Sequence, residues 1–181
     1  MIAATMYDTI IHQESVANGM PFGVVKGVIK KESNFDPNCE LGGAVGLMQM
    51  TLPAAREMGY KGSLKALYGP PTNIKYGTKY LKSMVGIWDT VAPTYDDRIS
   101  LGLASYNLGQ GRIKNAVSLA KKPEWAHVKS ALNQLIGTAK SLTKRRINIT
   151  LNYVDMIKTY AAEFNPLHDE MLAFADSGLK K

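Results

Sequence analysis

One glutamate falls on a helix face that is otherwise apolar. Val25, Val28 and Ile29 precede Glu32 by seven, four and three residues, so a helix places all four on one face, whereas Lys26 points elsewhere. Burial and the negative end of the helix dipole both disfavour an ionised carboxylate, so both are expected to raise the pKa of Glu32. A carboxyl group that stays protonated near neutral pH can serve as a general acid. A helix-end glutamate that simply reaches solvent fits the same pattern, so Glu32 is a candidate catalytic residue.

The segment after this glutamate is rich in glycine and is the second candidate. Three glycines fall within residues 42–46 and precede the run Leu-Met-Gln at residues 47–49. Such a backbone can turn tightly and approach a ligand closely, although an ordinary flexible loop has the same composition. No Gly-Lys-Ser or Gly-Lys-Thr follows, so a phosphate-binding loop is excluded.

The third candidate lies at a predicted helix end, where Tyr106 and Asn107 precede Gly109 and Gly111. Tyr106 shares a helix face with apolar residues three and seven positions earlier, so packing alone could explain it. Asn107 before two glycines also fits a helix stop. The Gly-x-Gly lacks the third glycine and the preceding strand of a dinucleotide site, which is therefore excluded.

The elements that must position these candidates are helices, because Gly and Pro separate helix-length apolar patterns and strand-like alternation is scarce. Residues 34–50 are predicted to be a loop, and Thr72 or Asn73 is predicted to cap the helix that follows residue 71. We therefore predict an all-α fold class, with residues 1–181 forming one domain. The predicted helices cover about residues 3–18, 21–33, 51–59, 72–88, 96–106, 110–121, 124–136 and 141–164, the last ended by Asn165-Pro166 before a short terminal helix.

The composition fits a folded domain without a membrane span or a metal centre. The 181 residues are 45% hydrophobic and 20% charged, so the chain can bury a core and disorder is not expected. The apolar runs are too short to cross a membrane, so no membrane insertion is expected. Cys39 is the only cysteine, and His12, His127 and His168 lie far apart. Neither a disulfide, nor a metal site, nor a cofactor is therefore predicted.

The charge balance is strongly basic. Lys and Arg number 22 against 15 Asp and Glu, which gives a net charge of +7. Such a surface attracts polyanions, which include nucleic acid, acidic lipid and the anionic bacterial cell wall. The cluster Lys144-Arg145-Arg146 is short, and basic runs are usually solvated faces, so we expect no nucleic-acid partner. The first residues lack a basic segment and the first Lys is Lys26, so no signal peptide is recognised.

Four short motifs, taken in order, resemble the signature of one family. They are Glu-Ser at residues 32–33, Gly-Leu-Met-Gln at 46–49, Tyr-Asn-x-Gly-x-Gly at 106–111 and Tyr-Val at 153–154. This order is similar to that of the soluble lytic transglycosylases, which belong to family twenty-three of the glycoside hydrolases. The resemblance runs from about residue 15 to residue 165. It implies a compact goose-type lysozyme-like domain of about seven to nine helices with a substrate cleft.

The resemblance also implies a role for each matching residue. Glu32 matches the single catalytic acid, and Ser33 matches its partner, which helps to hold the helix end. Tyr106 and Asn107 match residues beside the catalytic carboxyl group, and Tyr153 matches one whose hydroxyl approaches the reacting sugar. Substrate contacts are implied for Ser33, Gly46, Leu47, Met48, Gln49, Tyr106, Asn107 and Tyr153, with Gln49 as a hydrogen-bonding side chain.

The chain departs from the family pattern at three places. Many members have a second Ser before Gly-Leu-Met-Gln, where this chain has Cys-Glu-Leu-Gly at residues 39–42. Many have an acidic residue shortly before the late Tyr, and residues 145–152 contain none. Thr-Leu-Pro at residues 51–53 also differs from the usual run after the Gln. These departures concern substrate contacts more than the chemistry.

The implied activity is cleavage of the β-1,4 bond between N-acetylmuramic acid and N-acetylglucosamine in peptidoglycan, with a 1,6-anhydromuramoyl product. Hydrolysis by a muramidase of the same fold is the alternative, and it needs a second carboxylate to activate water. A non-catalytic wall-binding or virion component and a basic nucleic-acid-binding helical module are further alternatives. Candidates for the second carboxylate are Asp36, Glu40, Asp96 and Asp97.

The implied partner is the glycan strand of bacterial peptidoglycan, and we expect the chain to act as a monomer. The wall lies outside the cytoplasm and no export signal is recognised, so a phage endolysin or a virion-borne enzyme is expected. A bacterial enzyme that uses specialised secretion is the alternative origin.

Overall fold

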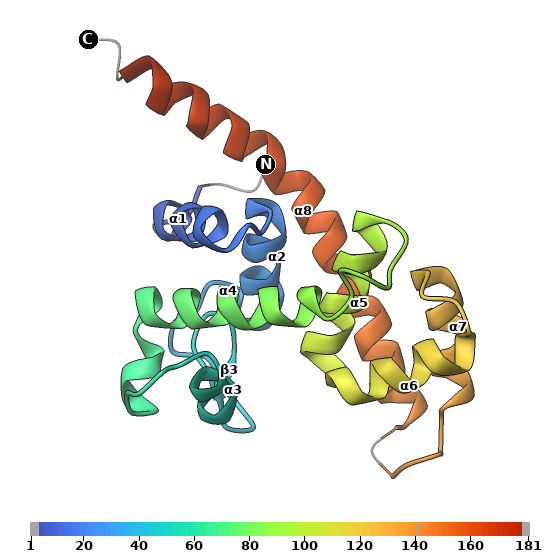
Figure 1. Ribbon diagram of the computed structural model, residues 1–181. Helices are drawn as coiled ribbons and strands as arrows, with labels where there is room; N and C mark the ends of the chain where they lie inside the picture. The colour runs from blue at the N-terminus through green and yellow to red at the C-terminus, as the bar shows by residue number, and fades with distance from the viewer. Residues whose placement is uncertain (1–3, 141, 179–181) are drawn as a thin grey trace. The chain divides into compact units, whose positions relative to one another are not determined.

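A computed structural model describes residues 4–140 and 142–178 of the chain. Within these residues the chain forms eight α-helices, one 3-10 helix and three two-residue strands (Figure 1). The predicted all-α fold class and the range of seven to nine helices are confirmed for this part of the chain. The elements are α1 (Asp8–Asn18), α2 (Phe22–Ser33), β1 (Glu40–Leu41), β2 (Ala44–Val45), β3 (Met50–Thr51), α3 (Leu52–Glu57), η1 (Lys65–Tyr68), α4 (Pro70–Gly86), α5 (Tyr95–Leu108), α6 (Gln110–Ala120), α7 (Trp125–Gln134) and α8 (Lys144–Gly178).

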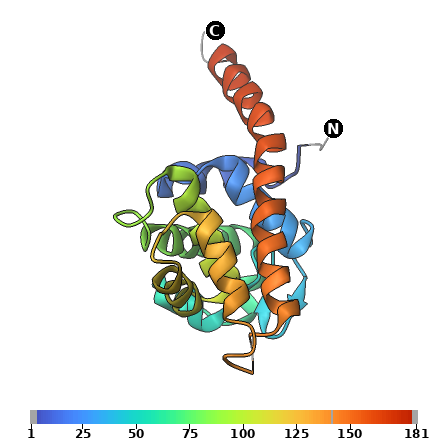
Figure 2. The same cartoon turned by 90° about the vertical axis from the view of Figure 1, so that its right-hand side faces the viewer.

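The last helix is longer than the sequence predicts. α8 begins after Thr143, whose hydroxyl accepts a hydrogen bond from the Arg146 N–H at 3.2 Å. It continues through Asn165-Pro166 to Gly178, so the predicted break and the separate terminal helix are wrong (Figure 2). A proline inside a helix removes one backbone hydrogen bond, but the chain can remain helical on both sides of it.

Residues 34–50, predicted as a loop, contain two short strands and the start of a third. β1 pairs with β2 and β2 pairs with β3, both antiparallel, in the order β1-β2-β3. The β1–β2 turn is Gly42-Gly43, and the two glycines have φ angles of 60° and 82°, as a two-residue hairpin turn favours. Strands of two residues are too short to show alternation, so hydrophobic periodicity could not reveal them.

The chain divides into two compact units. Unit 1 comprises Met1–Lys79 and Met156–Lys181, and unit 2 comprises Tyr80–Asp155. Unit 1 holds α1, α2, α3 and the three strands, and unit 2 holds α5, α6 and α7. The helices α4 and α8 contribute residues to both units.

In unit 1, the helix α2 is buried along most of its length. Val25, Val28 and Ile29 are fully buried, which confirms the predicted apolar face. A Cβ atom at Gly23 would lie 2.6 Å from the backbone carbonyl oxygen of Ala161 in α8, so a larger residue would force the two helices apart. This close approach fixes α2 as a central element of unit 1.

Lys26 lies on the remaining side of α2 and is fully buried as well. Its ammonium Nζ lies 2.7 Å from Oδ2 of Asp8, at the start of α1, and 4.7 Å from the ring centroid of Phe164. The Thr5 hydroxyl donates a second hydrogen bond to the Asp8 carboxylate. The prediction that Lys26 points away from the apolar face is confirmed. The side chain points toward the buried Asp8 carboxylate of α1. Its charge therefore links α1 to α2.

The start of α4 also differs from the prediction. The helix begins at Pro70, in the first turn that proline favours, so the predicted cap at Thr72 or Asn73 is wrong. Asn73 lies inside the helix and is fully buried. A buried amide needs hydrogen-bond partners, and Asn73 finds them outside its own helix.

The Asn73 amide holds the chain between β2 and β3. Its Nδ2 donates to the carbonyl oxygens of Val45 and Leu67, each at 2.8 Å, and its Oδ1 accepts from the Met48 N–H at 2.7 Å. A Cβ atom at Gly46 would collide with this amide, and Gly46 has a φ of 75°, so both space and backbone conformation require glycine there. One side chain thus satisfies two backbone groups of this segment and one of η1.

Unit 2 is built around two buried tryptophans. Trp88 and Trp125 are 3% and 5% exposed, so their rings are core residues rather than an open stacking surface. The Trp88 indole Nε1 donates to the Ser105 hydroxyl at 3.1 Å, and the backbone N–H of Trp125 donates to the Asp97 carboxylate at 2.8 Å. Asp97 thereby connects the first turn of α5 to the start of α7.

Replacing Asp8 by asparagine would leave the Lys26 ammonium buried without a counter-charge. We expect the free energy of unfolding to fall by about 3 kcal/mol, because removing one partner strands the other charge. Urea unfolding at pH 7, followed by circular dichroism, measures the loss. The double variant Asp8→Asn/Lys26→Met should recover most of it. A loss below about 0.5 kcal/mol in the single variant, the range of ordinary surface substitutions, would contradict this account.

Replacing Asn73 by alanine removes three hydrogen bonds to buried backbone groups. The expected loss is about 3 kcal/mol in the free energy of unfolding, because those groups stay buried without partners. The matched control is Asn38→Ala, since Asn38 lies exposed in the neighbouring loop and should change stability by less than about 0.5 kcal/mol. Equal losses in the two variants would show that Asn73 has no special role.

Candidate functional site

The candidate catalytic carboxyl group lies at the C-terminal end of α2. Glu32 is the next-to-last residue of this helix and is partly exposed. Ser33, the last residue, is 7% exposed, and its hydroxyl donates to the carbonyl oxygens of Ile29 at 3.1 Å and Leu47 at 2.9 Å. The Ser33 side chain therefore ties the end of α2 to the glycine-rich segment.

The backbone next to Glu32 adopts a conformation that is uncommon outside glycine. Asn34 and Phe35 have φ angles of 52° and 66°, and Gln49 has a φ of 47°. Such left-handed residues persist only where the surrounding structure enforces them. In the described part of the chain the fourth non-glycine residue of this kind is Lys121. Three of the four thus lie directly after the Glu-Ser motif or end the Gly-Leu-Met-Gln motif.

Cys39 connects these two motifs. Its backbone carbonyl accepts hydrogen bonds from the Gly46 N–H at 2.8 Å and from Nε2 of Gln49 at 2.9 Å. The Cys39 thiol also contacts the carbonyl oxygen of Glu32, with Sγ at 3.9 Å. The sequence shows Cys39 only as a lone cysteine, because the group that matters here is a backbone carbonyl that any residue would supply.

Gln49 is oriented by this arrangement. Its Nε2 donates to the carbonyl oxygens of both Cys39 and Gly46, each at 2.9 Å, so both N–H groups of the amide are used within the loop. Oε1 is buried and has no hydrogen-bond partner among the residues that the structure describes. Leu47 and Met48 are fully buried, so Gln49 carries the partly exposed side chain of this motif. The Gln49 side chain therefore has one acceptor atom that the described residues do not use.

In unit 2, the Tyr-Asn motif closes α5. The Tyr106 ring packs on Tyr80 with centroids 5.4 Å apart. Oδ1 of Asn107 accepts a hydrogen bond from the Thr150 hydroxyl at 2.8 Å, and the Asn107 carbonyl oxygen accepts one from the Arg146 guanidinium at 2.6 Å. Two residues of α8 therefore fix Asn107, and one of them comes from the basic cluster seen in the sequence.

Tyr153 follows Thr150 by three residues on α8 and is 2% exposed. The predicted site residues are thus divided between the units. Residues 32–49 belong to unit 1, and Tyr106, Asn107 and Tyr153 belong to unit 2.

The neighbouring carboxylates have structural partners. The Asp36 carboxylate accepts a hydrogen bond from the Asn38 N–H at 2.9 Å, and the Glu40 carboxylate accepts one from the Tyr68 hydroxyl. The bond to Glu40 raises the pKa of the Tyr68 phenol, because it favours the protonated form. Asp97, in unit 2, binds the start of α7, as described above. Asp96 is exposed in the same first turn of α5.

The described part of the chain offers no obvious metal or membrane element. Nowhere in it do three or more His, Cys, Asp or Glu side chains come together as a metal site requires. None of its helices combines the length and the apolar character that a membrane crossing needs.

Two positioning residues, Asn73 and Thr150, do not follow from the sequence. Asn73 fits a helix cap by residue type, and Thr150 lies outside the four motifs. The sequence does hold one indication that Asn73 faces the interior. Gly77 follows it by one helical turn and so lies on the same helix face, where a Cβ atom would collide with Met48. For Thr150 the spacing gives no signal, because its partner Asn107 lies 43 residues away in the chain.

The chain matches known proteins in sequence along most of its length. The family described as the transglycosylase SLT domain matches residues 9–128. A membrane-bound lytic murein transglycosylase F from Shewanella pealeana is 34% identical over 158 residues, which cover 81% of this chain and 32% of that protein. The protein of the same name from Vibrio cholerae is 31% identical over 170 residues, which cover 87% of this chain and 31% of that protein. The chain therefore spans about a third of the length of these curated relatives.

Solved structures share the fold. The inactive mutant of lytic transglycosylase Slt from Pseudomonas aeruginosa matches with a TM-score of 0.71 and 19% identity, over 91% of this chain and 24% of that one. The 70-kDa soluble lytic transglycosylase from Escherichia coli matches with a TM-score of 0.63 and 22% identity, over 90% of this chain and 24% of that one. At these identities the likeness concerns the fold, and it agrees with the lysozyme-like helical fold that the motifs imply. The match at residues 9–128 covers about two thirds of the sequence, and the chain belongs to the transglycosylase SLT domain family.

Proposed function

We propose that the chain is a peptidoglycan lytic transglycosylase with Glu32 as its catalytic acid and base. The observation that carries this proposal is the setting of Glu32 at the end of α2. The adjacent Ser33 hydroxyl binds the Leu47 carbonyl, and Cys39 contacts both Glu32 and Gln49. The names of the relatives, lytic murein transglycosylases, support the same reaction.

The proposed reaction uses one carboxyl group twice. Protonated Glu32 donates its proton to the glycosidic oxygen of the β-1,4 bond, which leaves with the N-acetylglucosamine as positive charge grows on the anomeric carbon of N-acetylmuramic acid. The neighbouring acetamido group of the substrate assists this step. The Glu32 carboxylate then removes the proton of the C6 hydroxyl, whose oxygen bonds to the anomeric carbon. The product is a 1,6-anhydro sugar, and no water is consumed.

The alternative is hydrolysis by a muramidase, which needs a second carboxylate to activate water. In unit 1 the carboxylates that follow Glu32 in the chain, Asp36 and Glu40, already accept hydrogen bonds from the protein. In unit 2 Asp97 accepts one from the Trp125 N–H. These partners favour the mechanism with one carboxylate.

The other predicted site residues receive different roles in this proposal. Gln49 accepts a hydrogen bond from a donor of the sugar through Oε1, since its two N–H groups are occupied. Ser33 positions Glu32 and the loop, because its hydroxyl is buried against two carbonyl groups. Asn107 and Tyr153 contact the substrate, and Thr150 positions Asn107. The remaining predicted contacts are Gly46, Leu47, Met48 and Tyr106, of which Leu47 and Met48 act through their backbone since their side chains are buried.

We further propose that residues 1–181 act as one catalytic domain and as a monomer on glycan strands of the cell wall, with no nucleic-acid partner. The family match supports one domain, because residues 9–128 include parts of both units. The route to the wall is a separate proposal. A phage endolysin or a virion-borne enzyme is our proposal from the sequence, while the relatives named above are bacterial and membrane-bound by name.

The variant Glu32→Gln should lose cleavage of purified peptidoglycan, because an amide cannot donate the proton that the leaving oxygen needs. We expect a decrease of at least about 1,000-fold in the rate of turbidity loss, with an unchanged circular dichroism spectrum. Glu57→Gln, an exposed glutamate in α3, is the matched control and should remain active. Activity of the Glu32 variant within about tenfold of the unmodified protein would refute the assignment.

The products distinguish the two chemistries. Mass spectrometry of the released muropeptides should show 1,6-anhydro ends, each lighter by one water than the reducing end that hydrolysis leaves. Reducing ends as the main product would instead establish the muramidase.

The variant Thr150→Val removes the donor to Oδ1 of Asn107 while keeping the shape of the side chain. We expect kcat/KM on peptidoglycan to fall about fivefold to tenfold, because Asn107 loses one of its two fixed contacts. The control Thr9→Val replaces an exposed threonine of α1 and should leave kcat/KM unchanged. Thermal unfolding is measured for both variants. A loss of activity that merely follows the unfolded fraction would remove Thr150 from the site.

A further inference from the structure

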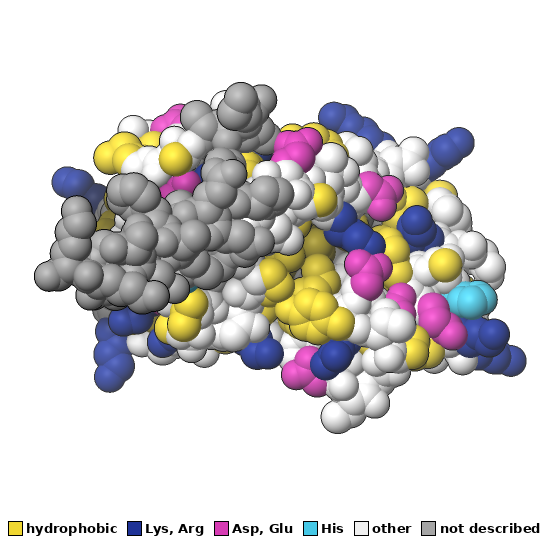
Figure 3. Space-filling view, turned by 90° about the horizontal axis from the view of Figure 1, so that it is seen from above, with side chains coloured by type: hydrophobic (Ala, Val, Ile, Leu, Met, Phe, Trp, Pro, Cys, Tyr) yellow, Lys and Arg dark blue, Asp and Glu magenta, His cyan; other side chains and the backbone are white. Residues whose placement is uncertain are grey.

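The chain that connects α4 to α5 lies in unit 2 (Figure 1) and ends at an exposed aromatic ring. Tyr95, the first residue of α5, is 51% exposed, and it is the aromatic member of the exposed large hydrophobic side chains in the described part of the chain. Val91, four residues earlier, is 48% exposed. The face seen in Figure 3 likewise shows hydrophobic side chains among charged ones of both signs. An exposed tyrosine offers a flat apolar surface with a polar end, which suits contact with a ligand.

Hydrogen bonds hold this connection in place. The Trp88 carbonyl oxygen accepts one from the Val91 N–H at 3.1 Å, and the Trp88 ring is buried. The Thr94 hydroxyl accepts one from the Asp97 N–H at 3.1 Å and so caps α5. Tyr95 therefore follows a fixed turn, and a ligand that contacts it would not have to order the chain first.

Arg98 and Asp89 place polar groups beside the Tyr95 ring. Arg98 follows Tyr95 by three residues on the same helix face, with its guanidinium carbon 5.3 Å from the ring centroid. Its Nη1 lies 3.7 Å from Oδ1 of Asp89, which is too far for a hydrogen bond. The Arg98 Nε is buried and has no hydrogen-bond partner among the described residues. An unpaired buried donor is costly, and an oxygen atom of a ligand would satisfy it.

The charges of this segment favour an uncharged ligand. Residues 89–98 contain three Asp and one Arg, so their net charge is negative. Asp96 and Asp97 lie in the first turn of α5 and oppose the positive end of its dipole, so this helix end does not attract an anion. A cation would compete with Arg98, which already lies over the ring and beside Asp89. The ligand that fits is neutral, with an apolar face and hydroxyl groups at its edge.

A pyranose ring has this chemistry. One face of the ring carries mainly C–H groups and can stack on an aromatic side chain such as Tyr95. A sugar hydroxyl can accept a hydrogen bond from Arg98 while it donates one to Asp89, which would bridge the gap of 3.7 Å between them. An N-acetyl group adds a methyl group, for which Val91 is an exposed apolar partner. The four side chains together match an N-acetylhexosamine.

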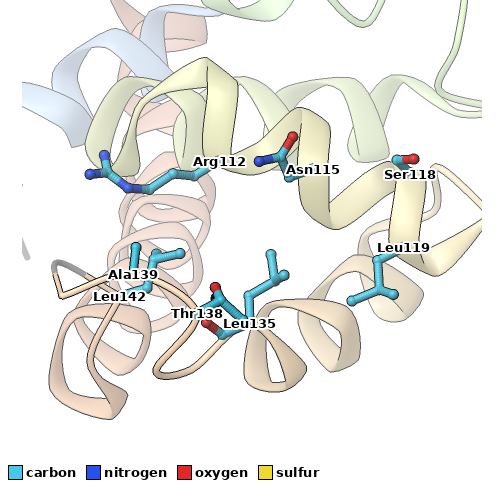
Figure 4. A pocket seen from close by; sticks show the side chains of 8 residues that line it. All are labelled: Arg112, Asn115, Ser118, Leu119, Leu135, Thr138, Ala139 and Leu142. Atoms are coloured by element: carbon cyan, nitrogen blue, oxygen red, sulfur yellow. Dashed lines mark hydrogen bonds between the residues drawn. The ribbon is translucent and has the colours of Figure 1, made fainter.

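The pocket between α6 and the chain that joins α7 to α8 lacks these features (Figure 4). No aromatic residue is among the described residues that line it. Its charged lining residue is Arg112, whose Nη1 already donates to the Leu108 carbonyl oxygen at 2.9 Å. A sugar would find neither a ring for stacking nor an unpaired charge at this place.

We propose that Val91, Asp89, Tyr95 and Arg98 form a second glycan site, the Tyr95 site, which binds an N-acetylhexosamine unit of the cell wall. Tyr95 and Tyr106 are eleven residues apart on α5, so about 16 Å of helix separates the Tyr95 site from the Tyr-Asn motif. The source of the sugar rests on the proposed function, because a peptidoglycan-cleaving enzyme meets this sugar in its substrate. Binding at the Tyr95 site holds the enzyme on the insoluble wall between cleavage events.

The direct test is a nuclear magnetic resonance titration with tri-N-acetylchitotriose, a neutral oligosaccharide of N-acetylglucosamine. Saturable shifts are expected at backbone amides of residues 89–98, in addition to any at residues 32–49. An increase in NaCl from about 50 to about 500 mM should change the dissociation constant at residues 89–98 by less than about twofold, because the ligand is uncharged. Absence of saturable shifts in residues 89–98, or a larger salt effect, would overturn the proposal. Shifts there that depend on protein concentration alone would identify a contact between copies of the chain instead.

Variants of the ring test the stacking contact. Tyr95→Ala should weaken binding at residues 89–98 at least about fivefold, because the stacking surface is lost. Tyr95→Phe keeps the ring and should change binding by less than about twofold. Thermal unfolding is measured for both variants, and only binding by folded protein is compared. Unchanged binding by Tyr95→Ala, or equal losses in the two variants, would contradict a stacked sugar.

Variants of the charged pair test the hydrogen bonds without changing the ring. Arg98→Gln and Asp89→Asn should each weaken binding about threefold to tenfold, because each removes a charge-assisted hydrogen bond. The matched control is Arg145→Gln, an exposed arginine of unit 2 whose loss changes the net charge by the same amount as that of Arg98. It should change binding by less than about twofold. Equal effects of Arg98→Gln and Arg145→Gln would show attraction by net charge and exclude the Tyr95 site.

Activity on two substrates separates the Tyr95 site from the proposed function. Tyr95→Ala should lower the rate on insoluble peptidoglycan about threefold and leave the rate on short soluble glycan fragments unchanged. Equal rates of Tyr95→Ala and the unmodified protein on both substrates, or equal decreases on both, would exclude a second site that holds the wall while leaving lytic transglycosylase activity in place. If Glu32→Gln keeps full activity, the proposed function fails, whereas the titration still decides whether the Tyr95 site binds the sugar.

Discussion

The hydrogen bonds of the buried Asn73 amide are the constraint on which the candidate site of unit 1 depends. The chain between β2 and β3 has little sheet or helix to satisfy its backbone, so its carbonyl and N–H groups need partners from elsewhere. Asn73 supplies them for Val45 and Met48, and Ser33 supplies one for Leu47. Since Ser33 follows Glu32 directly, the end of α2 that carries Glu32 and the loop are fixed with respect to each other. The left-handed backbone at Asn34, Phe35 and Gln49 is the strain that this fixed arrangement tolerates.

The position of α2 itself rests on an unusual buried charge. Lys26 is removed from water, which is costly unless the ammonium has a partner, and Asp8 with two flanking aromatic rings provides one. Gly23 lets the backbone of α8 approach on another side of the helix. A charge pair and a missing Cβ atom therefore complement the apolar face. Hydrophobic contacts are not directional, so they alone do not specify the rotation of α2 about its own axis. The buried Lys26–Asp8 pair does specify it, and this rotation sets the side of α2 on which Glu32 lies.

The two units carry different kinds of chemistry. Unit 1 has nearly balanced charge and holds Glu32, the proposed proton donor, while unit 2 carries almost all of the net positive charge. The residues of the Lys144-Arg145-Arg146 cluster differ in their roles. Arg146 donates a hydrogen bond to the Asn107 carbonyl oxygen, whereas Lys144 and Arg145 are exposed.

Periodic features could be predicted from the sequence because they are local. The helices, the apolar face of α2 and the motifs at Glu32, Gln49 and Asn107 all follow from residue types at short spacings. Features that depend on distant partners could not be predicted. The sequence predicts a cap at Asn73 and places Lys26 off the apolar face without a partner, because Val45 and Met48 lie 28 and 25 residues from Asn73, and Asp8 lies 18 residues from Lys26. Pro166 looked like a helix end, since a local rule cannot weigh one lost hydrogen bond against a helix that continues. Spacing along the chain determines which face a side chain occupies, but only tertiary packing decides what that face meets.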